Sequence, residues 1–195
     1  MNTRQQKYPV LSSILAAAVL AGCGGGTEAA DTAATPAAAA SPAYILADAM
    51  NDGVMNASNV LWESVLLEDI AADGTETYSG PTSDEGWNTL RDAMQSLLDV
   101  STQLKQMPAG WQVRDPSLEY EVPPGELAPA AIVELVNSQS GVWSAFSDVL
   151  RGTAERALQA TQTRDLNTLG EISNSLDAVC ESCHMQFWYP PSAAQ

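Results

Sequence analysis

Apolar side chains recur at every third or fourth position in four stretches of the chain, at about 43–66, 83–106, 129–162 and 166–187. This spacing gathers them on one face of an α-helix, whereas the strict alternation typical of a strand is nearly absent. In the first stretch the predicted inward face comprises Leu46, Met50, Val54, Ala57, Leu61 and Val65. Four amphipathic helices predict an all-α fold, a four-helix bundle in which facing side chains can build a cofactor site.

Polar residues mark where two of these helices begin. Thr82 and Glu85 have capping-box spacing ahead of the second helix, and Asp165 precedes the fourth as a candidate N-cap. We expect the third helix to run unbroken. The longer connections, at about 67–82 and 108–128, are expected to be loops of the kind that often cover functional sites.

Residues 1–22 are typical of an export signal rather than of the fold. Basic residues precede an apolar run that is shorter than the roughly 20 residues a membrane-spanning helix needs. The run ends in the letters LAGC, which resemble the lipobox of bacterial lipoproteins. That resemblance implies cleavage before Cys23 and lipid on Cys23; the alternative is an ordinary signal peptide with an incidental cysteine. Gly24 favours the outer membrane, by analogy with lipoprotein sorting, with the protein facing the periplasm.

Two further parts follow the signal peptide. Residues 23–43 are low in complexity and lack large apolar side chains, so they are expected to form a flexible, lipidated tether. Residues 44–195 have the size of one domain and contain all four predicted helices.

The charge balance bears on the partners of the protein. The chain has a formal net charge of −16, and removal of Arg4 and Lys7 with the signal leaves six basic and 24 acidic residues, a net charge of −18. Such an acidic protein is not expected to bind nucleic acid, which attracts basic patches. It suits a basic protein partner, although an acidic surface that only keeps the protein soluble explains the same charge.

The letters CESCH near the C-terminus carry the clearest chemistry in the chain. They contain two of the three cysteines, Cys180 and Cys183, and the only histidine, His184. C-x-x-C-H is the pattern of covalent haem c attachment, in which two thioethers hold the haem and the imidazole binds its iron. On a helix all three side chains share one face. The alternatives are a redox-active dithiol, a zinc site completed by carboxylates, and a pair of buried structural thiols.

The position of this motif on the last helix resembles the class II c-type cytochromes, the cytochrome c-prime family and its low-spin relatives. The run RDLNTLGEISNSLDAVCESCH is similar to the fourth helix of that family, and AMNDGVMNASNVLW and the ending FWYP resemble a subset of it. The resemblance implies a four-helix bundle with one haem on its last helix, and it allows a homodimer. Family members often carry a basic residue near a haem propionate on the first helix. Arg91 on the second helix is the candidate substitute here, and a solvated surface charge is the alternative.

The ligand at the sixth coordination position of the haem iron decides between electron transfer and gas binding. With no second histidine, methionine is the natural candidate. Met50 lies on the inward face of the first helix, where the low-spin relatives supply their ligand. Met55 is rotated from it by about 140° at 3.6 residues per turn, so we expect it to point elsewhere. Met50 is therefore the predicted metal ligand beside His184, with a flexible core filler as the alternative.

Three functions remain open at this point. The first is one-electron transfer in the bacterial periplasm, with a redox partner protein and a lipid anchor. The second is a five-coordinate haem protein that binds nitric oxide or carbon monoxide. The third is an accessory haem subunit of an envelope complex. A conventional enzyme is not expected, because the chain shows no constellation of nucleophile and base and commits its only histidine to iron.

Overall fold

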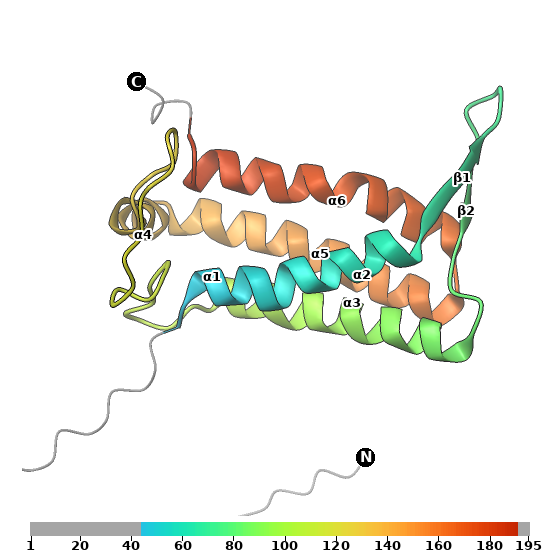
Figure 1. Ribbon diagram of the computed structural model, residues 1–195, viewed down its shortest axis with the longest axis horizontal. Coiled ribbons are helices and arrows are strands. Elements are labelled where there is room, and N and C mark those ends of the chain that lie inside the picture. The colour runs from blue at the N-terminus through green and yellow to red at the C-terminus, as the bar shows by residue number, and fades with distance from the viewer. Residues whose placement is uncertain (1–43, 191–195) are drawn as a thin grey trace, which may run out of the picture. The chain divides into compact units, whose positions relative to one another are not determined.

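The structure is a computed structural model that describes residues 44–190. The predicted signal peptide, Cys23 and the tether lie outside the described residues. The elements, in chain order, are α1 (Leu46–Asp48), η1 (Ala49–Met55), α2 (Asn56–Ser64), β1 (Leu66–Ile70), β2 (Glu76–Ser79), α3 (Asp84–Lys105), α4 (Pro129–Ser138), α5 (Ser140–Thr163) and α6 (Leu166–Phe187) (Figure 1). The described part is therefore mostly helical, as the periodicity predicts.

The long helices pack through the faces that the sequence marks as apolar. α1, η1 and α2 continue one another as a single rod, which packs against α3; α3 packs against α5, and α5 against α6 (Figure 1). Side chains from all of these helices share one apolar core, and Leu46, Leu61, Leu90, Met94, Leu97, Leu169 and Leu176 are fully buried in it. Burial of such side chains is the main favourable term that holds the helices together.

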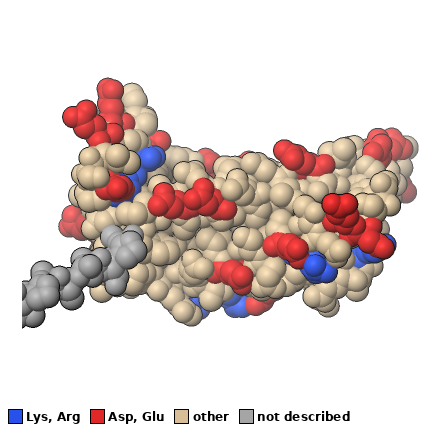
Figure 2. Space-filling model, turned by 60° about the horizontal axis from the view of Figure 1, so that its bottom comes forward, with Lys and Arg blue, Asp and Glu red and all other residues tan. Residues whose placement is uncertain are grey.

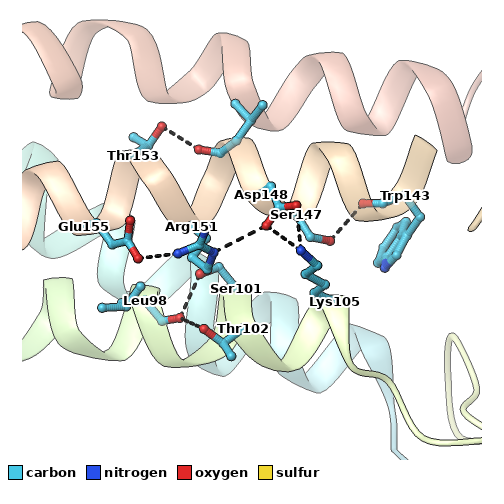
Figure 3. A network of polar contacts seen from close by, with 11 residues as sticks. Leu98, Ser101, Thr102, Lys105, Trp143, Ser147, Asp148, Arg151, Thr153 and Glu155 are labelled. Atoms are coloured by element: carbon cyan, nitrogen blue, oxygen red, sulfur yellow. Dashed lines mark hydrogen bonds and ion pairs between the residues drawn. The ribbon is translucent and has the colours of Figure 1, made fainter. Parts of the chain in front are cut away.

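The contact between α3 and α5 combines apolar packing with polar contacts along its edge. The Trp143 indole N–H donates to the Leu104 carbonyl at 2.7 Å, so this buried ring has a satisfied donor. Along the exposed edge, Lys105 of α3 pairs with Asp148 of α5 at 2.7 Å, and Asp148 also pairs with Arg151 (Figure 3). Exposed pairs like these contribute little to stability, and the apolar seam beneath them joins the two helices.

Two predicted helix starts have different outcomes. Asp165 is the N-cap of α6, and its carboxylate accepts a hydrogen bond from the Thr168 backbone N–H at 3.1 Å, as predicted. The capping box at Thr82 is wrong by one residue. Ser83 is the N-cap of α3, and its hydroxyl accepts from the Gly86 N–H at 3.1 Å. Ser83 has the extended backbone that an N-cap requires, with φ −124° and ψ 157°.

The third predicted helix is broken rather than continuous. Gln139, with φ −117° and ψ 37°, separates α4 from α5, and α4 turns across the end of α5 (Figure 1). The turn lets Ile132 and Val136 enter the core from this end. It also leaves Val142 42% exposed. The side chain of Gln139 accepts a hydrogen bond from Gln186 of α6 at 2.8 Å, which fixes the break against the last helix.

A β-hairpin replaces the first predicted loop. β1 pairs antiparallel with β2, and the pair projects beyond the helices (Figure 1). Every side chain of β1 is exposed, so the strand has no buried face to produce apolar alternation in the sequence. Its anchor is Tyr78, whose ring lies directly against the backbone of Gly170 in α6 and whose hydroxyl accepts from Asn174 at 2.7 Å.

The second long connection closes the opposite end of the helices, as a cover rather than as a free loop. The carbonyl of Gln112 accepts from the Leu46 N–H at 2.8 Å, and Trp111 and Val113 are buried. Further on, the Leu127 N–H donates to the carbonyl of Trp188, just past α6, at 2.7 Å. Both the start of the first helix and the end of the last are thereby tied to this connection.

Among residues 44–190, no helix is both long enough and apolar enough to cross a membrane.

Candidate functional site

A cavity of about 280 Å³ lies between the first helical rod and α6, with α5 behind it. The rod and α6 approach each other where the Trp62 indole donates to the Ser173 carbonyl at 3.1 Å, and they spread apart toward η1 (Figure 1). The cavity occupies that wider end. It is lined by Met50, Asn51, Val54, Met55, Ser58 and Trp62 of the rod, Leu104 of α3, Trp143, Phe146, Ser147 and Leu150 of α5, and Asp177, Val179, Cys180, Glu181, Cys183 and His184 of α6.

The three residues of the CESCH motif meet in this cavity. Cys180, Cys183 and His184 are each partly buried, and all three belong to its lining. The shared face predicted from their spacing on one helix is therefore present. Both cysteines are free thiols.

Core contacts on either side of the motif hold this part of α6 in place. Leu176 and Phe187 are fully buried, one before the motif and one after it. The Phe187 ring meets Trp143 edge-on, with the ring centroids 5.2 Å apart. The helix ends immediately afterwards, where the Trp188 N–H donates to the carbonyl of His184 at 2.7 Å. The motif is thus fixed at the last turns of a well-anchored helix.

Burial controls the protonation of the motif. It raises the pKa of the Cys183 thiol to about 12, with Cys180 adding to the effect. It also raises the pKa of Cys180, helped by Asp177. Burial lowers the pKa of His184, although the carboxylates of Glu181 and Glu126 oppose this. At neutral pH both cysteines are therefore thiols and the imidazole is neutral, which is the form that binds a metal.

These properties bear on the alternatives for the cysteine pair. A redox-active dithiol relies on a lowered thiol pKa, often at a helix N-terminus, whereas Cys180 and Cys183 have raised values near a helix C-terminus. A structural zinc site needs four ligands. Within residues 44–190, no three His, Cys, Asp or Glu side chains are grouped to hold a metal ion. The raised thiol pKa values disfavour a redox-active dithiol.

The methionines of the first helix lie differently from the prediction. η1 is π-helical, with hydrogen bonds that join residues five apart, so the residue five positions on returns to nearly the same side. Met50 and Met55 consequently both line the cavity. Met50 is partly buried and packs against the core, as predicted, whereas Met55 is 50% exposed. The prediction that Met55 points away from the cavity is wrong, because it assumed 3.6 residues per turn.

The structure does not bring Arg91 into this site. Arg91 lies on α3 more than three helical turns from Leu104, the residue through which α3 reaches the cavity. Its side chain is exposed and donates to Asn88 at 2.9 Å and to Asp92 at 2.8 Å. This matches the alternative interpretation of Arg91, a charge on the protein surface.

The charged residues at the cavity are acidic. Asp177 and Glu181 are exposed side chains of its lining, which contains neither lysine nor arginine. The Tyr189 hydroxyl donates to Glu181 at 2.6 Å. Acidic side chains also outnumber basic ones on the face drawn in Figure 2. Sequence reasoning missed both rim carboxylates, although their spacing from Cys180 and His184 on one helix contained the signal.

Aromatic side chains form one wall of the cavity. Trp62 and Trp143 both line it. Phe146 lies there as well, edge-on to Phe187 with centroids 6.1 Å apart. These aromatic rings give the cavity an apolar surface that suits a flat, apolar group.

Comparison of the chain with protein-family models, with curated proteins and with solved structures finds no match. The site must therefore be interpreted from its own residues.

Proposed function

We propose that this protein is a c-type cytochrome that carries one covalently bound haem c and transfers single electrons in the bacterial periplasm. In this proposal the packed helices form a four-helix bundle of the class II cytochrome type. One observation carries it: both thiols and the imidazole of a C-x-x-C-H motif line a single, largely apolar cavity, with a thioether on the facing helix. These donors match the attachment and axial ligation of haem.

Each residue has a definite role in the proposal. Cys180 and Cys183 would hold the group through two thioether bonds, so that it could not dissociate during electron transfer. His184 would bind the iron through an imidazole that burial keeps neutral. Trp62, Trp143 and Phe146 exclude water from the apolar side of the cavity. When bound, haem supplies an iron that accepts one electron from a donor and passes one electron to an acceptor.

Met50 is the proposed sixth ligand, and it favours electron transfer over gas binding. Its side chain lines the cavity and packs against the core, so binding a metal there would cost it little conformational freedom. A bound thioether raises the reduction potential and blocks the position that a gas would need. An open sixth position would favour the capture of nitric oxide or carbon monoxide instead.

The optical spectrum of the purified protein, oxidised and reduced, tests this function. We expect low-spin spectra in both states, a reversible one-electron potentiometric titration, and no change when carbon monoxide is added to the reduced protein. A high-spin reduced protein that binds carbon monoxide at once would contradict electron transfer. It would make the gas-binding function the better account.

The acidic rim supports a basic redox partner. Asp177 and Glu181 lie where the cavity meets solvent, and opposite charges steer association. Electron transfer to a lysine-rich cytochrome used as a probe should slow as salt is added, and Asp177→Asn should slow it at low salt. Asp69→Asn, on the hairpin, is the matched control and should have no effect. Equal effects of the two substitutions would show that only the net charge matters.

The lipobox supports a lipid anchor at Cys23, with the protein held at the outer membrane and facing the periplasm. Cys23→Ser prevents lipidation and should move the protein from the membrane fraction to the soluble periplasmic fraction. Membrane association that survives this substitution and a high-salt wash would contradict the anchor.

A further inference from the structure

A π-helical segment of backbone lies beside the proposed iron site. η1 is a π-helical segment of seven residues between α1 and α2, and it begins and ends without a break in the rod. π-helical turns are rare, are usually limited to a single turn, and are frequent at functional sites. Such a segment turns more slowly than an α-helix, so residues five apart come toward the same side of it. Met50 and Met55 are such a pair.

The two methionines occupy different depths of the same cavity. Met50 is partly buried and packs against the core, whereas Met55 is half exposed where the cavity meets solvent. Both face the motif of α6 across the cavity. In an ordinary α-helix only one of them would share this side with Val54. The π-helical geometry therefore supplies the site with two thioethers instead of one.

Methionine suits such an arrangement. Its side chain is unbranched and flexible, so Met55 can move inward without a change in the backbone. The other methionines of the described part are placed differently: Met94 is fully buried in the core, and Met107 and Met185 are outside the cavity lining.

We propose that Met55 is a second thioether ligand, which takes the sixth position of the iron when Met50 leaves it. This inference rests on the proposed haem, and it concerns which residues of the chain can bind the iron. Met50 binds in the resting state because it is the deeper of the two and is already packed. Met55 keeps the iron six-coordinate during excursions of Met50, and so protects it from small gases.

Leucine substitutions in the full-length lipoprotein, purified with its haem in detergent, test the proposal. Leucine conserves the volume of methionine but removes the sulfur. The readouts are the weak thioether-to-iron charge-transfer band of the oxidised protein and the binding of carbon monoxide to the reduced protein. Met50→Leu should keep the band at reduced intensity and bind carbon monoxide slowly. Met50→Leu with Met55→Leu should lose the band and bind carbon monoxide rapidly.

Met185→Leu is the matched control. Met185 has nearly the same exposure as Met55, 47% against 50%, but lies outside the cavity lining, so both readouts should remain those of the wild type. The proposal is overturned if Met50→Leu alone already equals the double variant, or if Met55→Leu alone abolishes the band. In either case the haem stays covalently attached and the proposed function stands. A protein that never acquires haem would instead refute the proposed function.

Discussion

Gly53 offers a sharp test of how the first helix packs. It lies within η1, between Met50 and Met55, where a Cβ atom would come 2.8 Å from Cγ2 and 3.0 Å from Cβ of Val100 on α3. Val100 is only 6% exposed, and valine in a helix keeps one side-chain rotamer about 90% of the time, so it cannot rotate away. Gly53→Ala must therefore push the two helices apart.

The expected change is the difference between two opposing effects. Alanine is favoured over glycine within a helix by about 1 kcal/mol. Overpacking a filled interface costs about 1–3 kcal/mol. We expect Gly53→Ala to lower the free energy of unfolding by about 1 kcal/mol, because the contact is with a rigid, buried side chain. In a Val100→Ala background two of the three contacting atoms are gone, so the same substitution should be nearly neutral or stabilising. The coupling between the two sites should thus be about 1–2 kcal/mol.

Gly152→Ala is the matched control for this cycle. Gly152 also lies within a helix, α5, but a Cβ atom there would have no neighbour within 4 Å. It should stabilise the protein by about 0.5–1 kcal/mol. Urea unfolding, followed by far-ultraviolet circular dichroism and by tryptophan fluorescence, measures all four variants, and coincident transitions justify a two-state analysis. If Gly53→Ala stabilises the protein as much as Gly152→Ala does, the close approach of η1 to α3 is refuted.

Two further predictions concern the hairpin and the start of α3. Gly170→Ala places a methyl group where the Tyr78 ring now lies, so it should release the hairpin from α6. Limited proteolysis should then cut the hairpin faster, while the helix content stays unchanged. An unchanged cleavage rate would show that Tyr78 does not hold the hairpin against α6. Ser83→Ala should lower the free energy of unfolding by about 1 kcal/mol in urea, since it removes the N-cap of α3. Thr82→Ala, at the residue that the sequence favours as the cap, should change the free energy of unfolding little. If Thr82→Ala destabilised the protein more than Ser83→Ala does, Thr82 would be the N-cap after all.

The helices could be predicted because each buries one face, and that face leaves a period of three to four in the sequence. The β-hairpin left no such trace, because β1 is exposed along its whole length. The break at Gln139 did leave a signal, which the prediction of an unbroken helix passed over: residues 137–141 read NSQSG, a polar and glycine cluster between the apolar runs that end at Val136 and resume at Val142. What separates α4 from α5 is the docking of Ile132 and Val136 on the core, which depends on the rest of the fold.

The candidate site was predictable where one helix contains it. Cys180, Cys183 and His184 are three and four positions apart, so their shared face followed from helical geometry and is present. Met55 was missed because a π-helical segment has no sequence pattern of its own that distinguishes it from an α-helix. Arg91 was proposed without knowledge of where α3 meets the cavity, which is a matter of tertiary packing.

Covalent attachment of haem is the central claim, and the intact mass of the purified protein tests it most directly. The protein is produced in a host with a c-type haem-attachment system, extracted with acid and acetone to remove loosely bound haem, and weighed by mass spectrometry. We predict the mass of the mature polypeptide plus one haem, and the bare polypeptide for Cys180→Ala with Cys183→Ala. A wild-type protein that has only the mass of the polypeptide, or a double variant that still carries the haem, would contradict the account.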